Sequence, residues 1–84
     1  MYLSGTVKDP SGEALIGATV TVSKDRTLIK GTTTNVEGKY QIELEPGVYQ
    51  VEFAYTGFVS KRITDVLVKR GQPNELSVVL DEST

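Results

Sequence analysis

Residues 34–58 read TNVEGKYQIELEPGVYQVEFAYTGF, and this stretch decides the fold class. Apolar and polar side chains alternate through two segments of it, which is the period-two pattern of strands with one buried face. The alternating apolar residues are Tyr40, Ile42 and Leu44, followed by Tyr49, Val51, Phe53 and Tyr55. Glycine-bearing turns precede, separate and follow the two segments, so the stretch predicts strand, turn and strand.

The same pattern extends over all 84 residues, in which glycine and proline punctuate runs rich in valine, isoleucine, threonine and tyrosine. It predicts seven strands, at residues 2–8, 18–24, 28–34, 40–44, 48–56, 59–68 and 75–81. Each strand has one apolar face, so two sheets must pack face to face. We expect one all-β domain over residues 1–84, a seven-stranded Greek-key sandwich of the immunoglobulin-like or prealbumin-like kind. The chain lacks cysteine and tryptophan, which argues against a true immunoglobulin domain.

The connections carry further expectations. A turn is expected at residues 9–12, where Pro10 presets φ and Gly12 accepts a positive φ. Pro46 and Gly47 have the order of a type II turn. Leu15 and Ile16 are expected to plug one end of the core. The sixth strand is expected to bend near Asp65, and residues 70–74 are expected to turn the chain into the last strand.

Charge and hydropathy exclude two classes of partner. Nine basic and eleven acidic residues mix along the chain, for a net charge of −2, whereas a nucleic-acid binder presents a basic face. No apolar run approaches the roughly 20 residues of a spanning helix, so direct membrane insertion of this domain is not expected. No signal peptide is visible, and a strand pattern begins at Tyr2. We therefore interpret Met1 as a cloning start and the chain as a domain excised from a larger protein.

The chemistry available to the chain is sparse. Without histidine or cysteine it has neither a Ser-His or Cys-His pair nor the usual zinc ligands. Glu43, Glu45 and Glu52 are the closest carboxylates in sequence. Glu43 and Glu52 have outward parity on strands expected to be adjacent, as charged residues of a solvated face do. We expect no enzyme, no catalytic residue and no cofactor.

A calcium site is the one metal site that the loop residues could form. Asp9, Asp25, Asn35 and Glu37 lie in expected loops and have the oxygen ligands that calcium uses. Their spacing does not match an EF-hand loop, and aspartate and asparagine favour turns because they hydrogen-bond nearby backbone. We expect no metal site, and a thermal melt compared in calcium and in chelator distinguishes the two interpretations.

Two other groups of residues have alternative interpretations. Lys61-Arg62 and Lys69-Arg70 form either a small basic patch near one end of the sandwich or the charges that protect edge strands from aggregation. The aromatic residues form either a sugar-stacking platform or the core, and their inward parity favours the core. They are Tyr40, Tyr49, Phe53, Tyr55 and Phe58, with Tyr2 expected to be the most exposed aromatic.

The first 20 residues contain a motif that resembles a known family. Its pattern is G-x-V-x-D-x-x-G-x-x-L-x-G-A-x-V, and every fixed position is present from Gly5 to Val20. The resemblance to carboxypeptidase regulatory-like domains continues through Thr34, Gly38, Tyr40, Ile42, Leu44, Pro46, Gly47, Tyr49, Val51, Gly57 and Phe58. Asn35 departs from the usual aspartate of the family. The resemblance implies a prealbumin-like (transthyretin-like) seven-stranded sandwich.

The resemblance also implies a function. Members are mostly non-catalytic modules, and very commonly the periplasmic N-terminal extension of TonB-dependent outer-membrane receptors in Bacteroidetes-type bacteria. The expected location is therefore extracytoplasmic, in the periplasm or cell envelope, with neighbouring domains or a periplasmic protein as partners. Two alternatives remain open: a carbohydrate-binding or adhesive module of a secreted protein, and the folding-support domain of a metallocarboxypeptidase. A glycan array tests the carbohydrate alternative.

One neighbouring family, the Cna B-type pilin and adhesin domains, forms a lysine isopeptide with the help of a buried glutamate. The position four residues after Tyr49, where that glutamate belongs, is Phe53. Glu52 has the opposite parity, and Lys8 lies at the end of its strand rather than in the middle. We therefore expect no self-crosslink, and an intact mass short by one ammonia or one water contradicts this.

Overall fold

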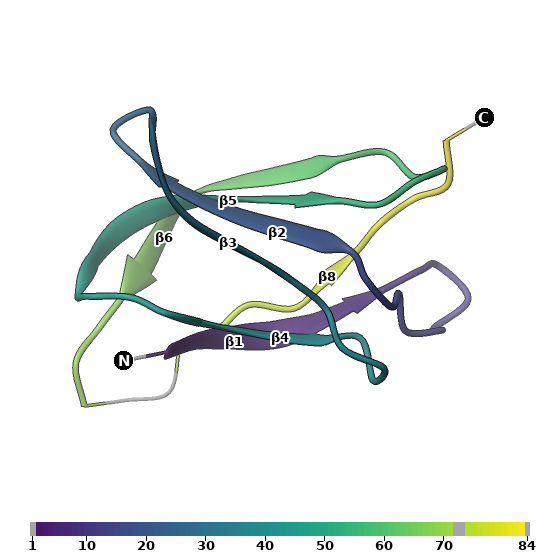
Figure 1. The fold of residues 1–84 in the computed structure, drawn as a ribbon, viewed down its shortest axis with the longest axis horizontal. Coiled ribbons are helices and arrows are strands. Elements are labelled where there is room, and N and C mark those ends of the chain that lie inside the picture. Colours follow the sequence, from purple (N-terminus) through teal and green to yellow (C-terminus); the bar gives the residue numbers. More distant parts are fainter. Residues whose placement is uncertain (1, 72–73, 84) are drawn as a thin grey trace.

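A computed structural model describes residues 2–71 and 74–83, which form two four-stranded sheets packed face to face (Figure 1). The expected all-β sandwich is confirmed. The strands are β1 (Tyr2–Lys8), β2 (Thr19–Lys24), β3 (Thr27–Thr33), β4 (Lys39–Glu43), β5 (Gly47–Ala54), β6 (Lys61–Val68), β7 (Asn74–Glu75) and β8 (Val78–Val79).

The order of strands decides which edges are open. In one sheet β1 lies between β4 and the pair β7 and β8, and the other sheet has the order β3-β2-β5-β6. All pairs are antiparallel except those that join β1 to β7 and β8. The sandwich therefore has β3 and β4 as edge strands on one side, and β6 with β7 and β8 on the other.

The connection between β4 and β5 differs from the expectation. These strands belong to different sheets, so residues 34–58 contain two strands on opposite sides of the core rather than adjacent strands of one sheet. The φ of Gly47 is not positive, and Gly47 already begins β5, so the type II turn at Pro46 and Gly47 is wrong. Alternation reports which face of a strand is buried, but it does not report which strand lies alongside.

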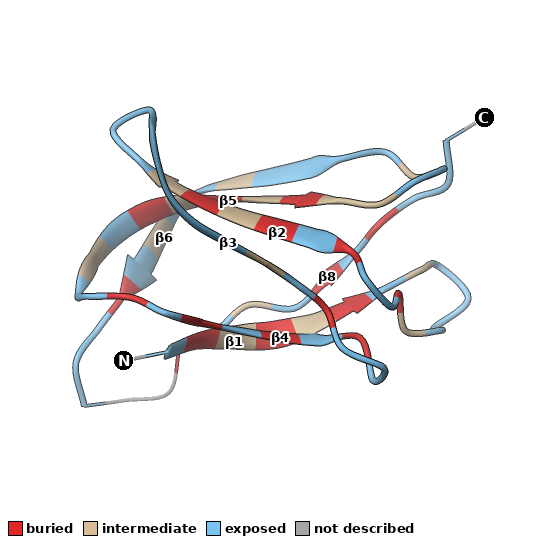
Figure 2. Ribbon diagram, in the orientation of Figure 1, coloured by how far each residue is buried: buried red, intermediate tan, exposed pale blue. Residues whose placement is uncertain are grey.

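The core follows the parity of the strands (Figure 2). The inward residues of β2, namely Val20 and Val22, are fully buried, and so is Ala18 just before the strand. Leu15 is buried as expected, whereas Ile16 is 53% exposed, so only the first of the two plugs the core. The remaining buried apolar residues are Leu3, Val7, Tyr40, Ile42, Leu44, Tyr49, Val51, Phe53, Val68, Val78 and Leu80.

The last expected strand is split into two short segments, β7 and β8, because the Leu76 carbonyl and the Thr6 N–H between them bond side chains instead of backbone. The carbonyl of Leu76 accepts the hydroxyl of Tyr40, and the side chain of Ser77 accepts the N–H of Thr6 at 3.1 Å. Gly5 permits this approach, since a Cβ on Gly5 would lie 1.9 Å from the Leu76 oxygen. The seven expected strands therefore become eight.

Most turns form where they were expected. The N–H of Gly12 donates to the carbonyl of Asp9 at 3.0 Å, which closes the turn at residues 9–12. Asp25 and Arg26 both have positive φ and form a two-residue hairpin loop between β2 and β3. The bend at Asp65 is confirmed as a bulge in which the register of β6 shifts and φ is 55°. Of the turn expected at residues 70–74, Gln72 and Pro73 lie outside the described residues.

Thr34 is a buried polar residue that fastens the β1–β2 loop to the chain after β3. Its hydroxyl donates to the carbonyl of Leu15 and accepts the N–H of Ala18 at 2.9 Å. Only 4% of its surface is exposed, so water cannot take over either bond. These side-chain bonds add to two backbone bonds at the same place, from the N–H of Gly17 to the Thr34 carbonyl at 3.1 Å and from the N–H of Thr34 to the Ala18 carbonyl at 2.9 Å.

Replacing Thr34 with valine keeps its shape and removes both bonds. We expect Thr34→Val to lower the free energy of unfolding by about 1–3 kcal/mol, because a buried carbonyl and N–H lose their partner. Urea denaturation measures this, with Thr34→Ser as the control that keeps the hydroxyl. A midpoint for Thr34→Val equal to that of the wild type, with Thr34→Ser destabilised, contradicts the assignment.

Candidate functional site

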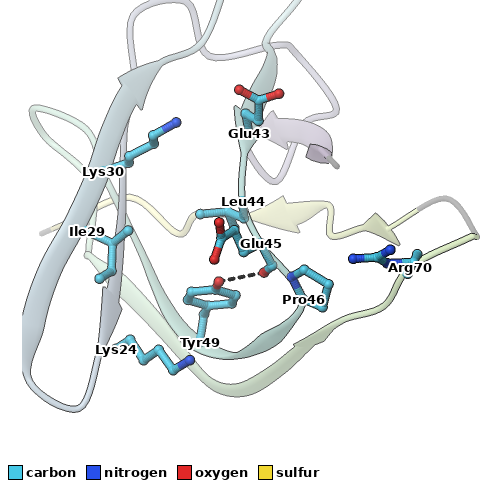
Figure 3. A pocket seen from close by; sticks show the side chains of 9 residues that line it. All are labelled: Lys24, Ile29, Lys30, Glu43, Leu44, Glu45, Pro46, Tyr49 and Arg70. Carbon is cyan, nitrogen blue, oxygen red and sulfur yellow. Dashed lines mark hydrogen bonds between the residues drawn. The ribbon is translucent and has the colours of Figure 1, made fainter.

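A groove of about 660 Å³ opens between the sheets on the side where β3 and β4 are edge strands (Figure 3). Its floor is apolar and includes Leu44 and the ring of Tyr49. The Tyr49 hydroxyl donates to the carbonyl of Glu45 at 2.5 Å, which ties the start of β5 to the chain that leaves β4. The groove is therefore anchored where the backbone crosses from one sheet to the other.

The charge of the groove changes sign from one wall to the other. Lys24 and Lys30 come from the β2–β3 hairpin, whereas Glu43 and Glu45 come from β4 and the residues after it; Arg70 approaches from beyond β6 (Figure 3). None of these five groups lies in an ion pair with another described residue. The groove thus presents separate basic and acidic walls that are available to a partner.

Two features hold the basic wall in place. The Nζ of Lys24 lies 5.5 Å from the centroid of the Tyr49 ring, a cation–π contact. On β3, Val22 pairs with Lys30 and Ser23 pairs with Leu28, so Ile29 is the extra residue of a bulge. Lys30 points toward the groove (Figure 3), and a charge at such a position and a bulge both discourage uncontrolled pairing of another strand with the β3 edge. Both features therefore make unselective strand pairing at the β3 edge unfavourable.

Sequence reasoning missed this groove. Lys24, Lys30 and Arg70 are far apart in the chain, and the sequence shows neither the bulge at Ile29 nor the crossing after β4. The signal that was present is the weak alternation of residues 28–34, which marks an edge strand with little to bury. Leu28 is 64% exposed and Ile29 is 44% exposed, consistent with that signal.

The three neighbouring carboxylates of the sequence do not gather in space. Glu43 and Glu45 line the groove, whereas Glu52 lies on the other sheet and pairs with Arg62 at 3.5 Å. The expectation that Glu43 and Glu52 lie on adjacent strands is wrong, because β4 and β5 belong to different sheets. Of the three carboxylates, only Glu43 and Glu45 therefore share the groove.

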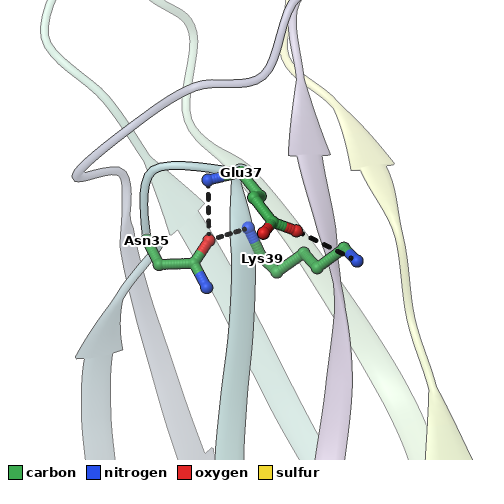
Figure 4. Close-up of polar contacts among 3 residues, drawn as sticks. All are labelled: Asn35, Glu37 and Lys39. Atoms are coloured by element: carbon green, nitrogen blue, oxygen red, sulfur yellow. Dashed lines mark hydrogen bonds and ion pairs between the residues drawn. The ribbon is translucent and has the colours of Figure 1, made fainter.

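The loop residues considered for calcium act on the backbone. The Oδ1 of Asn35 accepts the N–H groups of Glu37 at 2.9 Å and Lys39 at 3.0 Å, and Glu37 pairs with Lys39 at 3.3 Å (Figure 4). Asp25 sits in the β2–β3 turn, at the other end of the strands. Over residues 2–71 and 74–83, no three acidic side chains gather as metal ligands do.

Asp9 organises its turn in the same way. Its Oδ1 accepts the hydroxyl of Ser11 at 2.6 Å and the N–H groups of Ser11 and Glu13, each at 2.9 Å. The hydroxyl bond lowers the pKa of the Asp9 carboxyl most, and the backbone bonds lower it further against a raising effect of desolvation. The charged form is thus the one that the turn stabilises.

The two basic pairs do not form one patch. Lys61 and Arg62 begin β6, whereas Lys69 and Arg70 follow its end. Lys61 and Lys69 are eight residues apart, which is about 26 Å along an extended strand. The patch near one end of the sandwich is therefore wrong, and only Arg70 reaches the groove.

The aromatic residues are divided between core and rim. Tyr40, Tyr49 and Phe53 are buried as expected, and Tyr40 meets Phe53 edge-on across the two sheets with 5.5 Å between ring centroids. Burial, with a smaller contribution from Glu75, raises the pKa of the Tyr40 hydroxyl. Tyr55 and Phe58 are only partly buried against the core. Tyr2 is exposed, as expected.

The residues considered for an isopeptide crosslink lie where the alternation of the strands predicted them. Phe53 is fully buried in the centre of the core, Glu52 points outward to Arg62, and Lys8 is exposed at the end of β1. No buried lysine and glutamate therefore meet at these positions. The intact-mass prediction itself stays a prediction. Separately, the described residues contain no helix long and apolar enough to cross a membrane.

The architecture places the chain in the class of transthyretin-like β-sandwich domains. A family model for the carboxypeptidase regulatory-like domain matches residues 2–81. The chain belongs to that family, as the motif from Gly5 to Val20 implied. No curated protein sequence matches the chain significantly.

Solved structures share the fold. The Bacillus anthracis TIE protein is 26% identical with a TM-score of 0.76, covering 96% of this chain and 16% of that one. Klebsiella pneumoniae 5-hydroxyisourate hydrolase is 20% identical with a TM-score of 0.76, covering 100% and 93%. A chain of the type II cohesin-X-dockerin complex from Acetivibrio cellulolyticus is 21% identical with a TM-score of 0.69, covering 95% and 56%. This chain therefore spans about a sixth of the TIE protein and about half of the chain in the cohesin-X-dockerin complex.

Proposed function

We propose that the protein is a non-catalytic interaction module of a cell-envelope protein, the periplasmic N-terminal domain of a TonB-dependent nutrient receptor. Membership of the carboxypeptidase regulatory-like family supports the module role. The short span of the chain on the TIE protein, 16% of its length, supports a place within a longer chain. The observation that carries the interaction role is the open edge of β3 beside a groove with charged walls.

The partner that this edge fits is an extended segment of a neighbouring domain or periplasmic protein, added as a strand beside β3. The side chains of such a strand alternate between the groove and the outer face of the sheet. Those toward the groove meet the basic wall of Lys24 and Lys30, so they carry carboxylates. Those toward the outer face meet the exposed Leu28.

The location is tested with a cysteine at Val36, which is 77% exposed and lies outside the groove, because the chain has no cysteine of its own. In the full-length parent protein, a membrane-impermeant maleimide is expected to label Val36→Cys only after the outer membrane is permeabilised. Labelling in intact cells places the domain outside the cell, and no labelling before lysis places it in the cytoplasm. Either result overturns the periplasmic proposal. The sequence that follows residue 84 in the parent gene must also encode a plug and a barrel.

The partner surface is tested in the same cells with a photo-reactive amino acid. Placed at Leu28, it is expected to crosslink to a neighbouring domain or an envelope protein. The matched control is Val79, an exposed apolar residue on the opposite side of the sandwich. Lys24→Glu with Lys30→Glu is expected to reduce the crosslink at least about fivefold, by the cost of placing like charges together. Equal crosslinking at both sites, or no effect of charge reversal relative to Lys8→Glu with Lys61→Glu, rejects this surface.

A further inference from the structure

The first and last strands of the domain are neighbours that run in the same direction. Leu3 pairs with Asn74 and Lys8 pairs with Val79 in a parallel register. The chain consequently enters at the Tyr2 end of β1 and leaves beyond β8 at the opposite end (Figure 1). A pull on the two ends therefore acts along the strands.

This geometry gives the domain a mechanical property. When two parallel strands are pulled from opposite ends, every hydrogen bond between them is loaded at once. When strands are pulled from the same end, the bonds break one after another. We propose that the domain is a load-bearing module, which transmits tension along its parent chain while staying folded. This rests on the proposed function in one respect only, namely that the domain is part of a longer chain.

Specific bonds join the terminal segment, residues 74–80, to β1. The N–H of Leu76 donates to the carbonyl of Ser4 at 2.8 Å, and the N–H of Leu80 donates to the carbonyl of Lys8 at 2.9 Å. Between them, the side chain of Ser77 accepts the N–H of Thr6. The break between β7 and β8 is thus bridged by a side chain, so resistance continues along the whole length of β1.

A third strand, β4, also holds the terminal segment against β1. The hydroxyl of Tyr40, on β4, donates to the carbonyl of Leu76. Sliding the terminal segment along β1 must also break this bond, which crosses over Gly5. The load is thereby shared by three strands of the sheet rather than two.

Buried side chains act as a second restraint. Val78 and Leu80, from the terminal segment, are buried in the same core as Leu3 and Val7 of β1. A shift of one strand along the other by one residue turns these side chains toward the opposite face. Shear therefore exposes apolar surface in addition to breaking hydrogen bonds.

The exit of the chain is tied to the other sheet. The N–H of Val59 donates to the carbonyl of Asp81 at 2.8 Å, and the N–H of Ser83 donates to the carbonyl of Gly57 at 2.9 Å. Tension at the C-terminal end reaches the β5–β6 connection before it reaches β8. The force is therefore distributed over both layers of the sandwich.

Single-molecule force spectroscopy tests the inference, with the domain held between two handles in two geometries. Handles at the N- and C-terminal ends load β1 and the terminal segment in shear. Handles at the N-terminal end and at Glu43→Cys load β1 and β4 from one end, because Tyr2 pairs with Glu43 at the end of an antiparallel ladder. Forced unfolding follows the unfolding barrier, and we expect the first geometry to need at least about twofold more force.

Two variants assign the resistance to particular bonds. Ser77→Ala and Tyr40→Phe are each expected to lower the force between the terminal handles. Ser77→Ala, whose side chain bonds Thr6 of β1 rather than β4, is expected to leave the force in the Glu43→Cys geometry nearly unchanged. Ser60→Ala, an exposed serine outside the strands, is the matched control. Equal forces in the two geometries, or release of the terminal segment as a separate low-force step, overturn the inference. Neither measurement involves a partner, so failure of the proposed docking surface is distinguished from failure here.

Discussion

Replacing Phe53 with alanine is expected to lower the free energy of unfolding by about 3–5 kcal/mol. Phe53 is fully buried at the centre of β5, and its ring meets Tyr40 from the opposite sheet. Truncation removes a large apolar contact and leaves a cavity that two rigid sheets cannot close. A domain of this length has a total stability of about 4–13 kcal/mol, so the loss is a large fraction of it.

Urea denaturation monitored by circular dichroism measures the effect. Phe58→Ala, which truncates a phenylalanine only partly buried at the rim, is the matched control and is expected to cost clearly less. If Phe53→Ala does not fold, Phe53→Leu keeps the measurement accessible, because it removes less of the buried ring and is expected to be less stable than the wild type without preventing folding. An unchanged midpoint for Phe53→Ala contradicts the central place of this ring in the core.

The second large effect is expected at Gly5. A Cβ there would lie 1.9 Å from the carbonyl oxygen of Leu76 and 3.0 Å from a ring carbon of Tyr40. Backbone cannot rotate away as a side chain can, so Gly5→Ala must displace the terminal segment from β1. That displacement breaks the bond from the Tyr40 hydroxyl and strains the bond to Ser77. We expect a loss of about 3 kcal/mol, at the upper end of overpacking effects.

Gly31→Ala is the control, because Gly31 also lies within a strand but a Cβ there meets only the Val20 carbonyl at an ordinary 3.5 Å. It is expected to be neutral or slightly stabilising, since alanine restricts the unfolded chain. Thermal unfolding of both variants, with hydrogen exchange at Leu76 and Leu80, measures the effect and locates it. Gly5→Ala with native stability and native protection at these amides contradicts the close approach.

Residues 34–58 show which part of the fold the sequence predicts, namely the buried faces, and which part it does not, namely the pairing of strands. Alternation identified the inward faces of the strands around Tyr40 and Phe53, and both rings are buried. The same stretch predicted a turn between adjacent strands, yet β4 and β5 lie in different sheets. Parity depends on which face of a strand is apolar, and that information is local. Pairing depends on where the chain goes after Pro46, and that is decided by the packing of the whole sandwich.

The candidate site was much less predictable. The sequence pointed to Glu43, Glu45 and Glu52 as neighbours, and the structure separates Glu52 from the other two. It left Lys61-Arg62 and Lys69-Arg70 open as one basic patch or as charges that protect edge strands, and the structure places the two pairs at the start of β6 and after its end. Charge clusters of a β-sandwich form between strands that are distant in sequence, so spacing along the chain is a poor guide to them.

The sequence by itself determined the class of fold, the buried faces and the family, because hydrophobic periodicity and turn chemistry are local and the motif from Gly5 to Val20 is continuous. Only the tertiary structure decided that residues 34–58 cross from one sheet to the other and that Lys24, Lys30 and Arg70 line one groove. It also decided that the last strand breaks over Gly5 and runs parallel to the first. These features depend on long-range backbone contacts, for which no single segment carries the information.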